Sequence, residues 1–232
     1  MTDHPRLGIL MLDTSFPRIP GDVGNPDSFD FPVTYRRVPG ATPEAVVEGD
    51  SRRWIDAFIR EGTALVQSGC TGLATTCGFL TLVRSDIATA CGVPVASSSL
   101  EQIPLLATLL PQDRTVGILT ISRASLTGAH LAAAQVPQGV PIEGMDGSHF
   151  ATTILRNAPD LDIARARDEM ITAAKRLCHD HPYVAAIVLE CTNMPPYAAD
   201  IARATGRPVY SILSYLNWFH NGLQPARYAG SE

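Results

Sequence analysis

The chain has 232 residues, of which 45% are hydrophobic and 18% are charged, a composition typical of a globular protein. The formal net charge is −5 and the basic residues form no stripe, so the sequence argues against nucleic-acid binding. We expect a cytosolic protein with no membrane partner, because no signal peptide is evident and no apolar run approaches the length of a bilayer span.

Short apolar runs alternate with amphipathic stretches through the first half of the chain. In chain order, the predicted strands cover residues 7–12, 31–38, 72–76 and 94–98. The predicted helices cover residues 50–68, 80–90 and 100–110. A turn-rich loop with many Pro, Gly, Asp and Asn residues occupies 13–32. Gly92 stands where a glycine commonly ends a helix.

The second half repeats this alternation. Its predicted strands cover residues 115–120, 141–145, 184–189 and 208–213. Its predicted helices cover residues 126–134, 163–177 and 196–204, the last ending at Gly206, and an amphipathic tail with Trp218 and Phe219 follows. Strands that alternate with helices predict an α/β fold with mainly parallel sheets.

The two halves also match in detail. Leu7–Leu10 resembles Val116–Leu119, Cys77 matches Cys191, and Gly92–Val95 resembles Gly206–Val209, in the same order in each half. We therefore predict two similar α/β lobes related by a pseudo-two-fold axis, with an active-site cleft between them. The first lobe is expected to comprise residues 1–100 and 208–232, and the second lobe residues 101–207.

Cys77 and Cys191 each follow a predicted strand and precede a predicted helix. The N-terminus of a helix carries a partial positive charge, which favours a thiolate and lowers the pKa of a cysteine. Ligands of parallel α/β sheets bind beyond the carboxyl ends of the strands. The two thiols are thus candidates for acid/base catalysis, although two ordinary buried cysteines remain an alternative.

The sequence resembles the aspartate/glutamate racemase superfamily, which includes hydantoin racemases and arylmalonate decarboxylases. The motif Glu190-Cys191-Thr192-Asn193-Met194-Pro195 resembles the family's Gly-Cys-Thr-His element. The segment Thr75-Thr76-Cys77-Gly78 resembles its Cys-Asn-Thr element. Asp13-Thr14-Ser15 stands where amino-acid racemases of the family carry an Asp-Ser pair.

The resemblance implies a two-base isomerase that needs no cofactor and no metal. One cysteine removes a proton next to a carboxylate or carbonyl, and the other returns a proton to the opposite face. The expected catalytic pair is Cys77 and Cys191. The expected substrate-binding residues are Asp13, Thr14, Thr76, Gly78, Phe79, Thr120, Ser122, Thr192 and Asn193. The family also implies a homodimer that acts on a small carboxylate or amino-acid-like molecule.

Three positions depart from the family's pattern. Asn193 replaces a histidine, and Gly78-Phe79 replaces an Asn-Thr pair that amino-acid racemases use on their substrate. Glu190 replaces a glycine and would oppose a thiolate in the cleft, unless it is protonated or bonded to a donor. These departures favour a hydantoin or another 2-substituted carboxylate over glutamate or aspartate.

Two other functions stay open. One is a decarboxylase or cis-trans isomerase on the same scaffold. The other is a non-catalytic ligand-binding or redox protein, in which the thiols form a reversible disulfide. The leading expectation is a racemase or epimerase that uses the two cysteines.

Overall fold

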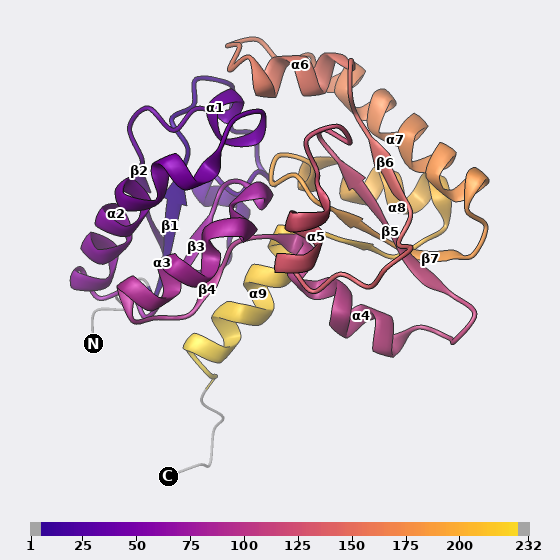
Figure 1. Cartoon of the computed structure of the whole chain (residues 1–232). Helices are drawn as coiled ribbons and strands as arrows, with labels where there is room; N and C mark the ends of the chain where they lie inside the picture. Colours follow the sequence, from indigo (N-terminus) through magenta and orange to yellow (C-terminus); the bar gives the residue numbers. More distant parts are fainter. Residues whose placement is uncertain (1–5, 227–232) are drawn as a thin grey trace.

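In the computed structural model, which describes residues 6–226, two α/β lobes lie side by side (Figure 1). The first sheet contains the parallel strands β1 (Leu7–Met11), β2 (Val33–Arg37), β3 (Gly72–Thr75) and β4 (Val95–Ala96). Their order in the sheet is β2-β1-β3-β4. β1 is buried over most of its length, as an inner strand of a parallel sheet should be.

Four helices accompany the strands up to the second lobe. They are α1 (Pro43–Val47), α2 (Ile55–Gln67), α3 (Arg84–Cys91) and α4 (Ile103–Leu109). The Thr42 side chain accepts a hydrogen bond from the Ala45 N–H and so caps α1. Gly92, with a φ of 70°, ends α3 in the left-handed conformation, as the sequence predicts.

The second lobe repeats the arrangement of the first. Its parallel strands are β5 (Thr115–Thr120), β6 (Ile142–Gly144), β7 (Val184–Leu189) and β8 (Val209–Tyr210). They lie in the order β6-β5-β7-β8, which is equivalent to the order in the first sheet. The predicted α/β fold with two similar lobes is thereby confirmed.

Five helices follow β5 in the chain: α5 (Gly128–Ala133), α6 (His149–Leu155), α7 (Ile163–Asp180), α8 (Ala198–Thr205) and α9 (Ile212–Leu223). α7 buries Ala166, Met170, Ala174 and Leu177, which are predicted apolar positions, whereas the predicted Ile163 at its first turn is 41% exposed. Periodic apolar residues thus predict the long helix correctly, except at its end.

Several elements differ from the prediction, and three of these differences have a clear physical reason. α1 and α6 are absent from the prediction, because helices of five and seven residues are too short to establish a periodic pattern. The predicted strand at 208–213 shortens to β8, because Ser211 forms a capping box and α9 begins at Ile212. α9 packs Ile212 and Leu216 against Leu7 and Ile9 of the first sheet.

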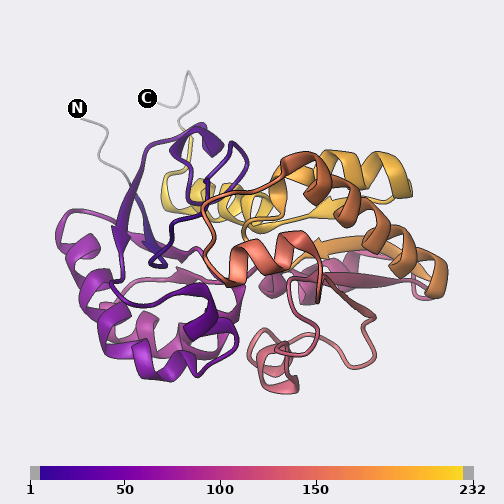
Figure 2. The ribbon, with the colours of Figure 1, turned by 90° about the horizontal axis from the view of Figure 1, so that it is seen from above.

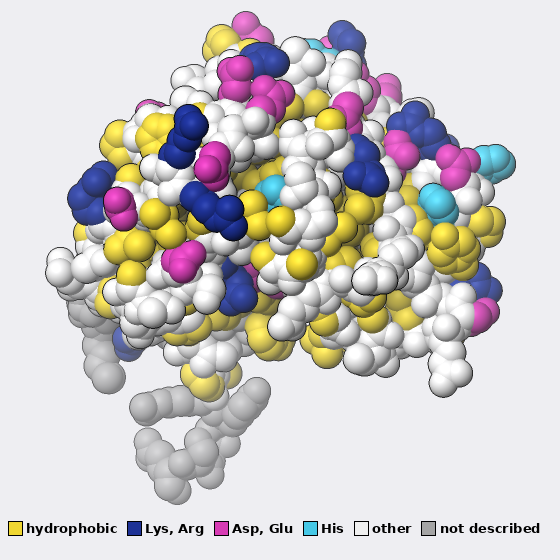
Figure 3. Space-filling model, viewed as in Figure 1, with side chains coloured by type: hydrophobic (Ala, Val, Ile, Leu, Met, Phe, Trp, Pro, Cys, Tyr) yellow, Lys and Arg dark blue, Asp and Glu magenta, His cyan; other side chains and the backbone are white. Residues whose placement is uncertain are grey.

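The predicted lobe boundaries stay a prediction. β8 pairs with β7 in the second sheet, whereas α9 packs against the first sheet. The outermost residues of the predicted first lobe, 1–5 and 227–232, lie outside the described residues. None of the helices within 6–226 combines the length and apolarity needed to cross a bilayer. Acidic and basic side chains are interspersed over the face shown in Figure 3.

The strand order determines where a ligand can bind. The chain leaves β1 toward β2 on one side, and β3 lies on the other side of β1. In sheets of this kind, the crevice for a ligand opens where two neighbouring strands send their connections in opposite directions. That point lies between the carboxyl ends of β1 and β3 in the first lobe, and of β5 and β7 in the second.

Candidate active site

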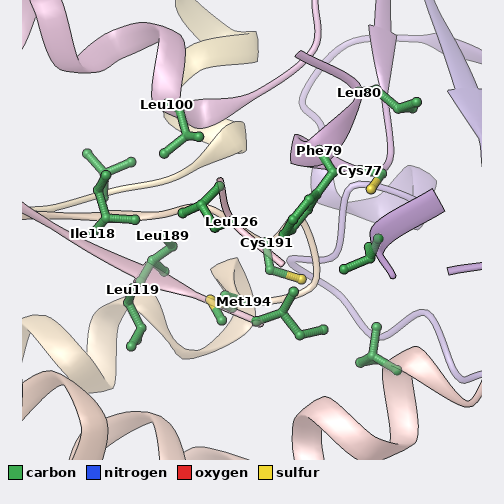
Figure 4. Close-up of a cluster of buried hydrophobic side chains, with 14 of the residues drawn as sticks. Cys77, Phe79, Leu80, Leu100, Ile118, Leu119, Leu126, Leu189, Cys191 and Met194 are labelled. Atoms are coloured by element: carbon green, nitrogen blue, oxygen red, sulfur yellow. The ribbon is translucent and has the colours of Figure 1, made fainter. Parts of the chain in front are cut away.

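Cys77 and Cys191 lie at these two crevices. Cys77 follows β3 and caps the 3₁₀ turn Gly78–Val83, and Cys191 follows β7. Both side chains are nearly buried, with 6% and 7% of their surface exposed. Both line one small cavity of about 20 Å³. The close-up in Figure 4 shows Cys77 on the ribbon of the first lobe and Cys191 on that of the second.

The cavity walls are mostly apolar and come from both lobes. The apolar lining residues are Leu12, Phe16, Pro43, Val47, Phe79, Ile121, Ile154 and Leu155. α1 of the first lobe contributes Pro43 and Val47, and α6 of the second lobe contributes Ile154 and Leu155. Figures 1 and 2 show α6 extending over the junction between the lobes toward α1.

Polar contacts connect α1 to the residues that follow α6. Arg156, just after α6, pairs with Glu44 of α1 and with Glu48, whose oxygen lies 3.2 Å from the Arg156 Nη1. The Asn157 Oδ1 accepts a hydrogen bond from the Ser15 N–H at 2.5 Å. These contacts join the two lobes beside the part of the cavity that α1 and α6 line.

Five of the predicted substrate-binding residues line the cavity: Thr76, Gly78, Phe79, Thr192 and Asn193. Two of them connect the cysteine loops to each other, because the Thr192 Oγ1 donates a hydrogen bond to the Thr76 carbonyl at 2.8 Å. The Thr76 Oγ1 in turn accepts from the Leu12 N–H at 3.0 Å. Both threonine hydroxyls are therefore engaged in holding the backbone around the thiols.

The other four predicted residues do not line the cavity. Asp13 accepts a hydrogen bond from the Gly40 N–H at 2.9 Å and pairs with Arg37. Thr14 accepts from the Arg18 guanidinium at 2.9 Å, and Thr120 donates to Glu190 at 2.8 Å, so each supports a residue that does line it. Ser122 bonds to Ser125 and to Asp146, outside the cavity.

A polar chain that the sequence analysis missed connects the loop after β1 to Cys191. The Arg18 Nη1 lies 2.8 Å from the Asp22 Oδ1, and the Asn193 amide donates to the Asp22 Oδ2 at 2.5 Å. The Asn193 Oδ1 accepts from the Cys191 thiol at 3.5 Å. Arg18 lines the cavity and lies over the Phe16 ring, 4.5 Å from its centroid. A signal was available in the sequence: an Arg-Asp pair four residues apart, in the long loop after the first strand.

Close packing of this loop against the second lobe fixes the polar chain. Gly21 has a φ of 95°, and a Cβ there would lie 2.9 Å from the Pro196 Cα. A glycine is therefore required both by the backbone conformation and by the space. The Val23 N–H also donates to the Thr192 carbonyl at 3.4 Å. The loop is held in place by the same turn that carries Cys191.

The environment of the thiols differs from the prediction. Burial and the nearby Glu190 raise the pKa of Cys77 to about 12, against the backbone N–H groups of Phe79 and Leu80, which lower it. Burial and Glu190 also raise the pKa of Cys191 well above its usual value. The prediction of lowered thiol pKa values is therefore wrong, because desolvation outweighs the field of the adjacent turn. At neutral pH both cysteines are therefore protonated thiols.

Glu190 lines the cavity and is completely buried. Its Oε2 accepts a hydrogen bond from the Thr120 hydroxyl, whereas its Oε1 has no hydrogen-bond partner among the described residues. Burial raises the pKa of Glu190 to about 7, and the hydrogen bonds from Thr120 and the Ile121 backbone oppose this rise. The acid that the sequence marked as unusual thus faces the cavity and is bonded to a donor.

Gly78 is required by the position of Glu190. A Cβ at Gly78 would lie 2.3 Å from the Glu190 Oε1 and 2.7 Å from the Glu190 carbonyl oxygen. We expect Gly78→Ala to lower the free energy of unfolding by about 1–3 kcal/mol, the usual range for overpacking. Thermal unfolding measures this effect, with Gly128→Ala as the control because a Cβ there meets nothing within 4 Å. An unchanged melting temperature for Gly78→Ala would contradict the described packing.

No cluster of three or more His, Cys, Asp or Glu side chains that could hold a metal ion occurs within residues 6–226.

Sequence comparison links the chain to lyases. A dimethylsulfoniopropionate lyase of Durusdinium sp. clade D is 30% identical over 228 residues, which cover 94% of this chain and 75% of that protein. Dimethylsulfoniopropionate lyase 6 of Emiliania huxleyi is 28% identical over 235 residues, again 94% of this chain but 59% of the relative. The chain thus spans three quarters or less of the length of these relatives. No family model matches the chain.

Comparison with solved structures identifies the fold. A mutant of arylmalonate decarboxylase has a TM-score of 0.65 and 17% identity, with 97% of each chain covered. Allantoin racemase from Pseudomonas fluorescens has a TM-score of 0.61 and 13% identity, covering 97% of this chain and all of that one. Glutamate racemase from Francisella tularensis, in complex with D-glutamate, has a TM-score of 0.56 and 17% identity.

The expectation of a racemase, and of an isomerase in general, is wrong. The relatives in sequence are lyases, and the racemases among the structural neighbours share only the fold. The reason lies in the chemistry that the two classes have in common. A thiol beside a carbon acid removes a proton in either class, so paired cysteines do not reveal whether the proton returns or a group leaves.

The resemblance seen in the sequence and the shared fold both hold, whereas the reaction class changes. The chain belongs to the dimethylsulfoniopropionate lyase family, and it shares its fold with arylmalonate decarboxylase, glutamate racemase and allantoin racemase.

Proposed function

We propose that this chain is a lyase that cleaves dimethylsulfoniopropionate, or a close analogue, into dimethyl sulfide and acrylate. This substrate combines a carboxylate, acidified C–H bonds next to it, and a sulfonium group one carbon further on. The observation that carries the proposal is the cavity in which two thiols, one arginine and one carboxyl group meet between apolar walls. The sequence similarity to lyases of this name supplies the substrate.

The elimination needs one base. A Cys77 thiolate takes a proton from the carbon next to the carboxylate, and the C–H electron pair forms the new carbon–carbon double bond. The bond between the β-carbon and sulfur breaks, and its electron pair stays on sulfur. Acrylate and neutral dimethyl sulfide result, and Cys77 is left as a thiol that must lose its proton before the next turnover.

The contacts of the two thiols support Cys77 as the base. The backbone N–H groups of Phe79 and Leu80 stabilise a negative charge on its sulfur. The thiol of Cys191 instead donates its proton to the Asn193 Oδ1, which is fixed through Asp22. We assign Cys191 the role of a hydrogen-bond donor: when the substrate binds, its single S–H turns from the Asn193 Oδ1 to the charge developing on the substrate carboxylate.

A bound sulfonium would help to form the thiolate. The positive charge of the substrate favours the charged form of a nearby thiol and lowers its pKa, against the effect of burial. The raised pKa values therefore keep both thiols protonated until a cationic substrate binds. Apolar walls such as Phe79 and Ile121 keep water away from the carbanion-like intermediate.

Arg18 is the proposed anchor for the substrate carboxylate. Its Nε is buried and has no hydrogen-bond partner among the described residues, and its guanidinium is held in place by Asp22 and Thr14. A hydrogen bond to a charged group contributes roughly 1.5–3 kcal/mol. A fixed guanidinium also presents the fork geometry that a carboxylate prefers.

Replacement of Arg18 by glutamine should raise KM for dimethylsulfoniopropionate by roughly 10- to 100-fold, which is that free energy expressed as an affinity. Steady-state kinetics with detection of dimethyl sulfide measures the change. Arg37→Gln is the matched control, because Arg37 pairs with Asp13 away from the cavity and should leave KM unaltered. An unchanged KM in Arg18→Gln would remove Arg18 from the binding site.

The function itself is tested by incubation of the purified chain with dimethylsulfoniopropionate. Gas chromatography of the headspace should detect dimethyl sulfide, and liquid chromatography should detect acrylate in equal amount. Cys91→Ser, at a thiol that does not line the cavity, should release both products at the wild-type rate. Absence of both products would refute the proposal. The homodimer and the cytosolic location stay predictions from the sequence.

A further inference from the structure

The Glu190 carboxyl group has no evident role in proton transfer, yet the fold holds it at the cavity. It is completely buried, and its Oε1 has no hydrogen-bond partner among the described residues. An unsatisfied buried polar atom costs about 1–3 kcal/mol, and more when the group is charged. Such an atom in a native structure requires an explanation, and a ligand that it binds is one.

The surroundings keep Glu190 in this position. The Thr120 hydroxyl holds the Oε2 at 2.8 Å from the end of β5. On the other side, Gly78 has no side chain, and the Glu190 Oε1 occupies the space that a Cβ there would need. Two elements from different lobes thus form a place for the carboxyl group next to the Cys77 turn. In this position the carboxyl group raises the pKa values of both thiols, which disfavours the thiolate that the elimination needs.

The charges that line the cavity suggest what the carboxyl group binds. Arg18 and Glu190 are the two ionic side chains among its described lining residues, one basic and one acidic. A ligand that carries a carboxylate and a separate positive charge complements both. The rings of Phe16 and Phe79 also line the cavity, and aromatic faces attract organic cations.

We propose that Glu190 binds the positive sulfonium group of the substrate, and that it makes the cavity select carboxylates with a β-cation over neutral carboxylates of the same shape. The selectivity rests on the proposed function for the identity of the substrate. The proposed selectivity covers every carboxylate with an onium group on its β-carbon, because sulfonium and quaternary ammonium groups present the same positive charge to Glu190.

The reaction itself assigns Glu190 to binding. The positive charge on sulfur disappears as the carbon–sulfur bond breaks, so an anion beside it stabilises the bound substrate more than the transition state. Loss of the charge in Glu190→Gln should therefore raise KM without lowering kcat. The product dimethyl sulfide is neutral and is not retained by the carboxylate.

The test uses two ligands of the same shape that differ in charge: 3-(trimethylammonio)propionate and 4,4-dimethylpentanoate. Isothermal titration calorimetry gives their Kd values without any need for turnover. Wild-type protein at pH 8 should bind the cationic ligand at least about tenfold more tightly, and Glu190→Gln should lose most of this preference while it binds the neutral ligand with an unchanged Kd. Glu101→Gln, a buried acid that does not line the cavity, is the control.

A measurement on the wild type avoids any effect of the substitution on folding. The preference for the cationic ligand should increase as the pH rises from 6 to 8, because Glu190, with its pKa raised to about 7, gains its charge in this range. The other groups that line the cavity and can carry a charge are Cys77, Cys191 and Arg18, and burial raises the pKa values of both thiols above this range.

Three results would overturn the role of Glu190. They are equal affinity of the wild type for the two ligands, equal weakening of both ligands in Glu190→Gln, and a preference that does not change with pH. These results are independent of the proposed function. Dimethyl sulfide release without charge selectivity would refute only the role of Glu190, whereas charge selectivity without dimethyl sulfide release would refute only the lyase activity.

Discussion

Cys77→Ser is expected to reduce kcat/KM for the release of dimethyl sulfide by roughly 10³-fold, within the range that a positioned general base contributes. A serine hydroxyl at this position is a far weaker acid than a thiol, so the alkoxide needed for proton removal does not form. Cys77→Ala should be equally inactive, because both substitutions remove the base. Headspace gas chromatography at substrate concentrations well below KM measures this loss, and a melting temperature separates loss of catalysis from loss of fold.

Substrate binding should survive this substitution. Arg18 and Glu190 are unaltered in Cys77→Ser, so the Kd of a non-reactive β-onium carboxylate should stay within about twofold of the wild-type value, well under the 1.4 kcal/mol of a tenfold change. Activity of Cys77→Ser within tenfold of the wild type would contradict the assignment of Cys77 as the base.

Cys191 is expected to respond differently to serine and to alanine. Cys191→Ala should lower kcat by roughly 10²–10³-fold, the usual loss when one donor to a developing negative charge is removed. Cys191→Ser should retain much more activity, because a hydroxyl group also donates a hydrogen bond and can use the Asn193 Oδ1 in the same way. The rate constants of the two variants, compared under identical conditions, measure this difference.

The contrast between the cysteines tests the division of roles. Equal inactivation by serine and alanine marks a base, and partial rescue by serine marks a donor. The assignment would be reversed if Cys77→Ser retained activity while Cys191→Ser lost it. A symmetric loss at both positions would instead require both thiols to transfer protons, as in the two-base mechanism first expected from the sequence.

The sequence predicts the lobes and the meeting of the thiols for a physical reason. Long periodic segments such as α7 and buried strands such as β5 and β7 leave a pattern in the order of apolar residues. The repeat then places Cys77 and Cys191 at equivalent strand ends. Parallel topology makes such ends converge, so the shared cavity follows from the order of the elements.

Other parts of the site depend on packing that leaves no such pattern. Arg18 and Asp22 reach the cavity through an irregular loop, whose path is fixed by contacts with Pro196 and Thr192. The direction of the thiol pKa shifts depends on the degree of burial, which a motif at a strand end does not reveal. Asp13 fits the family's position in the sequence, yet its carboxylate turns to Gly40 and Arg37.

The reaction class could not be predicted from the thiols, because racemisation and elimination begin with the same proton removal. The residues that departed from the racemase pattern carried the missing information. Glu190 and Phe79 both line the cavity, and together with Arg18 they suit a substrate with two opposite charges.

The most direct test of the central claim follows both possible outcomes of proton removal in one experiment. The purified chain is incubated in D₂O with dimethylsulfoniopropionate and, separately, with amino acids and hydantoins, and ¹H NMR records acrylate formation and exchange of the α-proton. We predict acrylate and dimethyl sulfide in equal amounts from dimethylsulfoniopropionate, and neither exchange nor racemisation of the other compounds. Exchange or racemisation of an amino acid or hydantoin, with dimethylsulfoniopropionate left intact, would contradict the account.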